Sequence, residues 1–180
     1  MNEGLIPGRY AKALYKYATE QGESDSVYGQ MKNLAAAYAA EPALRKAVGN
    51  KFLPAMDKEK VLLSAAEAES DSCLSKFIKL VFDHNREDFM RDIALAYQKI
   101  YRIANNIAQV EIVTAHTLGA DQLSKIVEVV EQQLKGKKIE QTTRVDANLI
   151  GGFVIKADDQ LLDASIKNEL KKLRLQLLSK

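Results

Sequence analysis

Tryptophan is absent from this sequence of 180 residues, and cysteine and histidine are scarce. Cys73 is the only cysteine, which excludes a disulfide within the chain, and only two histidines accompany it. A structural zinc site takes four ligands from cysteine and histidine. One cysteine and two histidines leave little for such a site. We therefore expect no metal ion and no cofactor.

Long apolar segments are also missing. The longest apolar run extends from Leu34 to Ala40, only seven residues, whereas a membrane-spanning helix needs about 20. The first residues show no basic segment followed by an apolar stretch, so we expect no signal or transit peptide and no direct membrane insertion.

Neither sign of charge predominates. The chain has 26 Lys and Arg against 24 Asp and Glu, a net charge of +2. Residues 1–106 carry 15 basic and 14 acidic side chains, and residues 107–180 carry 11 and 10. Proteins that bind nucleic acids usually carry a large basic excess, so we expect no nucleic acid as partner. Binding must then rest mainly on apolar faces with local charge complementarity.

What the first part of the chain does contain is apolar residues at helical spacing. Successive stripes predict six amphipathic helices joined by short connections, which together imply a bundle. Asp57 is expected to cap the fourth helix and one residue of Ser70–Ser72 the fifth. Pro42 is expected to start the short third helix, and the apolar stripes of the other five helices begin at Tyr10, Val27, Val61, Leu74 and Phe89.

The period changes after Asn106. Alternation from Ala108 and again from Ile139 predicts strands, and Asp158-Asp159 is a turn candidate between two more. Helical spacing returns in Leu123–Leu134 and in Ile166–Leu177. The sequence is therefore predicted to be mainly α: a six-helix bundle in residues 1–106, followed by a small α+β domain in residues 107–180.

Candidates for chemistry have simpler structural interpretations. No phosphate-binding loop or dinucleotide fingerprint is present, and Gly151-Gly152 is expected to supply a positive φ or a close backbone approach. His84 is expected to end a helix, His116 to lie on the surface, and Cys73 to be a small buried side chain. We expect no catalytic residues.

Several segments resemble the delta subunit of bacterial F-type ATP synthase, a relative of the mitochondrial oligomycin-sensitivity-conferring protein. The N-terminal match is Arg9–Tyr15, and the middle match runs from Phe77–Leu80 to Asn85-Arg86. The most specific match is the signature Val145–Ile155, which continues through Asp158 and Leu162–Ile166. One departure is Ala164, where the family often has glycine.

The resemblance implies a stator subunit in the peripheral stalk, located at the cytoplasmic face of the bacterial inner membrane. Its N-terminal domain would bind the N-terminal segments of alpha subunits in a groove between helices one and five. Its C-terminal domain would bind the C-terminal ends of the b subunits. The residues expected to set the C-terminal fold are Gly151, Gly152, Asp163 and Ser165.

The expected alpha-subunit interface comprises apolar residues of the first and fifth helices. The fifth helix has five apolar residues within six positions, so one face meets the core and another meets a partner, or the whole helix is buried. The residues alone leave both interpretations open, and the resemblance favours the first. The expected interface residues are Tyr10, Ala13, Leu14, Tyr17, Phe77, Ile78, Leu80, Val81 and Phe82.

Two other classes of function are possible for a chain of this size. An RNA-binding antitermination-type factor is also a small helical bundle, but it calls for a basic N-terminal face and leaves the C-terminal signature unexplained. A small hydrolase or transferase needs a nucleophile beside a base, and the sequence offers no such pair.

Overall fold

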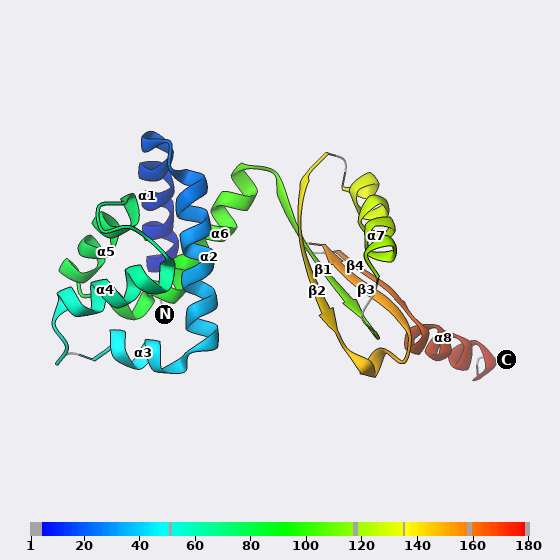
Figure 1. Cartoon of the computed structure of the whole chain (residues 1–180). Helices are drawn as coiled ribbons and strands as arrows, with labels where there is room; N and C mark the ends of the chain where they lie inside the picture. The colour runs from blue at the N-terminus through cyan, green and yellow to red at the C-terminus, as the bar shows by residue number, and fades with distance from the viewer. Residues whose placement is uncertain (1–4, 51, 117–118, 135, 158–159, 179–180) are drawn as a thin grey trace. The chain divides into compact units, whose positions relative to one another are not determined.

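The computed structural model describes residues 5–50, 52–116, 119–134, 136–157 and 160–178. The chain divides into two compact units, Met1–Ala104 and Asn105–Lys180, which are described separately (Figure 1). The first unit is helical and the second combines helices with a four-stranded sheet. The predicted fold class, a helical bundle followed by a small α+β part, is confirmed.

Within residues 5–50 and 52–104, the first unit has six α-helices and one short 3-10 helix. α6 packs against α1 and α2, and α4 packs against α2 and α5, while α1 also contacts α5. The bounds are α1 Leu5–Gln21, α2 Ser24–Ala40, α3 Pro42–Val48, α4 Ala55–Ala66, α5 Cys73–Asp83, η1 Glu87–Phe89 and α6 Met90–Ala104.

The core of this unit is formed by the predicted apolar stripes. Leu14, Met31, Leu74, Ile78 and Ile93 are each 1% exposed or less. Burial of such side chains contributes roughly 1.5–3 kcal/mol each, and because no single helix is stable alone, the packing holds the bundle together.

Polar side chains of α6 connect it to α2. The Gln98 amide donates a hydrogen bond to the Met31 carbonyl oxygen at 3.1 Å. The Tyr101 hydroxyl donates one to Asp25 Oδ1 at 2.7 Å. Burial, together with this bond and the negative charge of Asp25, raises the pKa of Tyr101 to about 12. The hydroxyl therefore stays protonated and keeps its role as donor.

The sequence predicted the helix ends only in part. Ser72 caps α5, because its hydroxyl oxygen accepts a hydrogen bond from the Ser75 N–H at 3.3 Å. The prediction that Asp57 caps α4 is wrong: α4 begins at Ala55, with Pro54 in the capping position. Asp57 instead lies in the first turn, where its charge favours the positive end of the helix dipole.

The second unit is built on a sheet of strand order β2-β1-β3-β4. β1 (Ile107–Thr114) pairs in parallel with β2 (Lys138–Val145), and α7 (Ala120–Gln133) connects them. β3 (Gly152–Ala157) is antiparallel to both β1 and β4 (Gln160–Ser165). η2 (Ala147–Leu149) precedes β3, and α8 (Ile166–Leu178) follows β4. Asp158-Asp159, the expected turn, lies outside the described residues.

The apolar face of the sheet packs against α7. Val110, Ile112 and Ile155 form the buried centre together with Val130 of α7. On the opposite face, Lys156 Nζ of β3 lies 3.0 Å from Glu111 Oε2 of β1. The alternation read from β1 thus separates a packed face from one that carries charge, as a half-buried strand requires.

Candidate partner-binding groove

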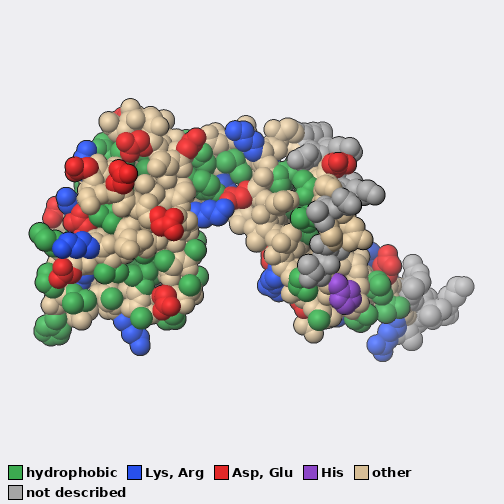
Figure 2. All heavy atoms as spheres, viewed as in Figure 1, with side chains coloured by type: hydrophobic (Ala, Val, Ile, Leu, Met, Phe, Trp, Pro, Cys, Tyr) green, Lys and Arg blue, Asp and Glu red, His purple; other side chains and the backbone are tan. Residues whose placement is uncertain are grey.

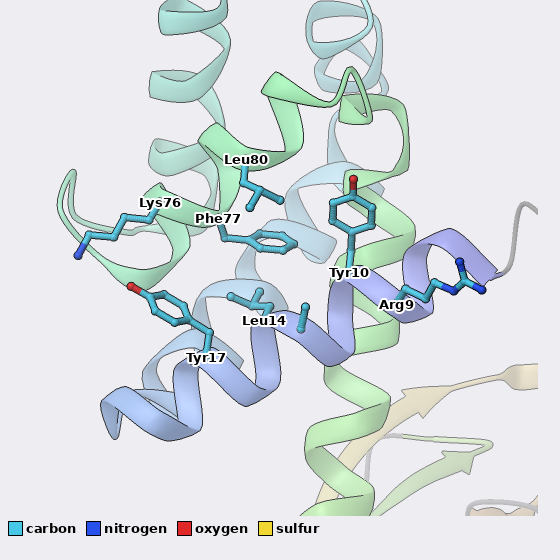
Figure 3. Close-up of a pocket in the computed structure, with 8 residues that line it drawn as sticks. Arg9, Tyr10, Leu14, Tyr17, Lys76, Phe77 and Leu80 are labelled. Carbon is cyan, nitrogen blue, oxygen red and sulfur yellow. The ribbon is translucent and has the colours of Figure 1, made fainter.

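An open groove of about 410 Å³ lies between α1 and α5 in the first unit (Figure 3). Tyr10, Ala13, Leu14 and Tyr17 of α1 form one wall, at the i, i+3, i+4, i+7 spacing of a helix face. Phe77 and Leu80 of α5 form the other wall. The middle of the groove is therefore apolar, although it faces solvent.

Aromatic contacts join the two walls near Tyr10. The ring centroids of Tyr10 and Phe77 lie 6.2 Å apart, edge to face. The rings of Tyr10 and His84 meet in a similar way at 6.4 Å. His84 itself ends α5, and its Nδ1 lies 2.8 Å from the Leu80 carbonyl oxygen. His84 thus occupies the helix-end position that the sequence indicated.

Burial differs sharply along the groove. Leu14 is 1% exposed and Phe77 is 7% exposed, so these two side chains also belong to the core. Leu80 is 46% exposed, although its side chain is apolar. A leucine left in water beside an apolar hollow marks a surface that a partner can cover.

The structure brings together six of the nine residues expected at an interface. The other three lie elsewhere: Ile78 and Val81 are buried at 0% and 1% exposure in the core, and Phe82 lies on the α4 side. Lys58 Nζ lies 6.0 Å from the centroid of the Phe82 ring. The nearly continuous apolar surface of α5 therefore divides between groove and core, because each residue turns about 100° around a helix.

Two basic residues that were not expected at this site also line the groove. Arg9 precedes Tyr10, and Lys76 lies four positions before Leu80 on the same helix. Helical spacing was the signal that could have found them, because Lys76 and Leu80 share a face. Lys58, by contrast, is buried and pairs with Glu87 at 3.5 Å.

Cys73 and His116, two of the candidates for chemistry, lie in different environments. Cys73 is 4% exposed at the start of α5, and burial raises the pKa of its thiol. A thiol that resists ionisation is a poor nucleophile. His116 is exposed. Among the residues that the structure describes, no cluster of three or more His, Cys, Asp or Glu is placed to hold a metal ion.

In the second unit, Gly152 packs against the end of β4 and Gly151 against the start of α8. Gly152 has φ of +77°, and a Cβ there would lie 2.3 Å from the Ala164 carbonyl oxygen. A Cβ on Gly151 would lie 2.5 Å from Cδ1 of Ile166. Both expected reasons for glycine, a positive φ and a close approach, therefore occur here. Ala164 pairs with Phe153 in the regular hairpin of β3 and β4.

Asp163 and Ser165, at the end of β4, cap the start of α8. The Ser165 hydroxyl and N–H both donate to Asp163 Oδ1, at 2.6 and 3.0 Å. These two bonds lower the pKa of Asp163. The Ser165 hydroxyl oxygen in turn accepts from the Asn168 N–H at 3.2 Å, which is the geometry of a helix N-cap.

In the second unit, β4 and α8 carry several exposed apolar side chains. Leu161 is 64% exposed and Leu170 is 54% exposed, and three further residues of these elements are similarly open. The three are Leu162, Ile166 and Leu175. Leu173 and Leu177, which belong to the predicted stripe, have side chains outside the described set. A second surface suited to a partner is therefore present.

The fold and the groove define a two-unit, mainly α-helical protein with an open apolar groove between two helices. The family model described as ATP synthase delta (OSCP) subunit matches residues 6–177. The chain belongs to this family of F-type ATP synthase subunits, which confirms the resemblance noted in the sequence.

Relatives match over nearly their full length. The chain is 35% identical over 178 residues to the ATP synthase subunit delta of Phocaeicola vulgatus, covering 98% of this chain and 96% of the relative. It is 31% identical to that of Azobacteroides pseudotrichonymphae, covering 98% and 100%.

A solved structure has the same fold. A chain in the cryo-EM structure of the Toxoplasma gondii mitochondrial ATP synthase hexamer matches with a TM-score of 0.72 at 20% identity. The match covers 96% of this chain and 97% of that one. Within the described residues, no helix combines the length and apolar character needed to span a membrane.

Proposed function

We propose that the chain is a non-catalytic stator subunit of a proton-translocating F-type ATP synthase. Residues 1–106 bind N-terminal segments of alpha subunits in the catalytic head. Residues 107–180 bind the C-terminal ends of the b subunits in the peripheral stalk. The chain is thereby held, as a peripheral protein, at the cytoplasmic face of the bacterial inner membrane.

The observation that carries this proposal is the open groove between α1 and α5. Its apolar residues recur at helical spacing, its volume is about 410 Å³, and Leu80 stands half exposed on its rim. A groove of this kind suits the apolar face of an amphipathic helix, laid in with anchors at i, i+3, i+4 and i+7. The resemblance to delta subunits noted in the sequence supports an N-terminal segment of alpha as that partner.

The second half of the proposal rests on β4 and α8. Their exposed leucines and isoleucine offer apolar area to a helical partner, and the resemblance to delta subunits supports the b subunits as that partner. Mechanically, rotation of the rotor exerts a reaction torque on the head. A connector with one partner on each unit opposes that torque without any chemistry of its own.

Leu80→Asp tests the groove. The substitution places a charge where the partner's apolar face would bury it, which is strongly unfavourable. We expect at least about a tenfold loss of affinity for an alpha N-terminal peptide, measured by calorimetry, which corresponds to about 1.4 kcal/mol. The fold should persist, because Leu80 is 46% exposed.

Leu95→Asp is the matched control, because Leu95 lies on α6, is 44% exposed and does not line the groove. It should bind the peptide like the unmodified chain, and circular dichroism should show both variants folded. Equal affinities for Leu80→Asp and the unmodified chain would refute the groove as the alpha-binding site.

A further inference from the structure

The two basic residues of the groove lie at its two ends. Figure 3 shows Lys76 beside Tyr17 at one end and Arg9 beyond Tyr10 at the other, with Leu14, Phe77 and Leu80 between them. A partner helix that covers the apolar centre therefore passes a cation at each end.

These cations are not committed to the fold. Within the residues that the structure describes, neither Arg9 nor Lys76 forms an ion pair. The other lysine of α5 behaves differently, because Lys79 Nζ lies 3.6 Å from Glu59 Oε1. A carboxylate oxygen of Glu23 accepts a hydrogen bond from the backbone N–H of Cys73, at the start of α5, at 3.4 Å. Arg9 and Lys76 are thus available to an incoming partner.

The charges of this unit are unevenly distributed. α1 and α5 together carry five basic and two acidic side chains, whereas the rest of residues 1–106 carries ten basic and twelve acidic ones. The two acids, Glu20 and Asp83, lie in the last turns of their helices and do not line the groove. On the face of the first unit that Figure 2 shows, charges of both signs are interspersed.

We propose that Arg9 and Lys76 select the groove's occupant, an amphipathic helix that carries an acidic side chain at each end of its apolar stripe. Arg9 and Tyr17 are eight residues apart, about 12 Å at the rise of an α-helix. The two acidic residues of the partner therefore lie roughly two to three turns apart. This inference rests on the proposed function, since it adds a charge requirement to the alpha-binding groove.

Reversing both charges tests the inference. Arg9→Glu with Lys76→Glu should weaken binding of an alpha N-terminal peptide, whose residues at the two stripe ends are set to Glu, by roughly 5- to 30-fold at low salt. The loss should shrink at several hundred millimolar salt, because exposed charges are screened there. Lys46→Glu with Lys60→Glu is the control, since both side chains are exposed, lie outside the groove and give the same change in net charge.

A charge swap completes the test. The Arg9→Glu, Lys76→Glu chain should bind the same peptide more tightly when its two end residues are Lys, while the unmodified chain prefers Glu. The proposal that Arg9 and Lys76 select the occupant is overturned if both pairs of substitutions weaken peptide binding equally, or if the preference for Glu over Lys does not reverse. The assignment of the groove as the alpha-binding site would still stand. If the unmodified chain fails to bind any of these peptides, both the proposed function and this inference fall.

Discussion

Gly152 combines a backbone angle and a contact that suit glycine alone. Its φ is +77°, and the space where a Cβ would stand is occupied by the Ala164 carbonyl oxygen. Gly151, one residue earlier, meets only the end of the Ile166 side chain. The two adjacent glycines therefore differ in how strictly each position excludes a side chain.

This difference gives a matched pair of variants. Gly152→Ala should lower the free energy of unfolding of the second unit by roughly 2–4 kcal/mol, because both the angle and the backbone clash oppose it. Gly151→Ala should cost about 1 kcal/mol or less, since Ile166 can change rotamer. Urea unfolding followed by circular dichroism measures both, and equal losses would contradict the assignment of strain to Gly152.

For single residues, the residue type predicted the structural role better than it predicted which other residues lie beside it. The sequence indicated that the glycine pair needed a positive φ or a close approach, and the two possibilities proved to coexist. It did not identify Arg9 and Lys76 as lining the groove, because a basic residue on a helix is ordinarily a solvated one. Only the packing of α1 beside α5 shows which exposed cations border the same hollow.

Among the elements, α8 depends on a short polar network at its start. Asp163 accepts two hydrogen bonds from Ser165, and Ser165 accepts one from the Asn168 N–H. The first turn of a helix has unpaired N–H groups, so such a cap stabilises it. The network also positions the helix that carries the exposed Leu170 and Leu175.

Ser165→Ala should therefore lower the stability of the second unit by about 1 kcal/mol at pH 7. Asp163 adds a pH dependence. Its folded pKa is depressed, so its contribution is present above the unfolded pKa, about 3.9, and is lost as pH falls through the folded value. Asp163→Asn should thus be less stable than the unmodified chain at pH 7, and the gap should narrow below about pH 4. Urea midpoints at both pH values measure it, and a gap independent of pH would contradict this role.

Helix and strand positions were largely readable from the sequence, because the change of apolar period after Asn106 marks where helices give way to the sheet. Helix ends were less readable. Asp57 has the side chain of a capping residue, yet the capping position is Pro54, three residues earlier, and α4 begins at Ala55. Similarly, spacing predicted that α5 is apolar on most sides, but not that Ile78 and Val81 face the core while Phe77 and Leu80 border the groove.

For the whole molecule, the charge is nearly neutral and the chain separates into two units. Each part of the chain carries a net charge of only +1 when divided at residue 106, so no broad electrostatic target exists for either. Each instead leaves apolar side chains in water, the first around the α1–α5 groove and the second along β4 and α8. Two such surfaces on separate units are what a connector between two partners requires.

The central claim is that both units must be engaged for coupling. The direct test uses membrane vesicles stripped of this subunit, to which either the full chain or residues 1–106 are added back. ATP-driven proton uptake and ATP hydrolysis are then measured together. The full chain should restore uptake, whereas residues 1–106 should bind the head but leave hydrolysis uncoupled from proton movement. Proton uptake restored to the same level by residues 1–106 would contradict the account.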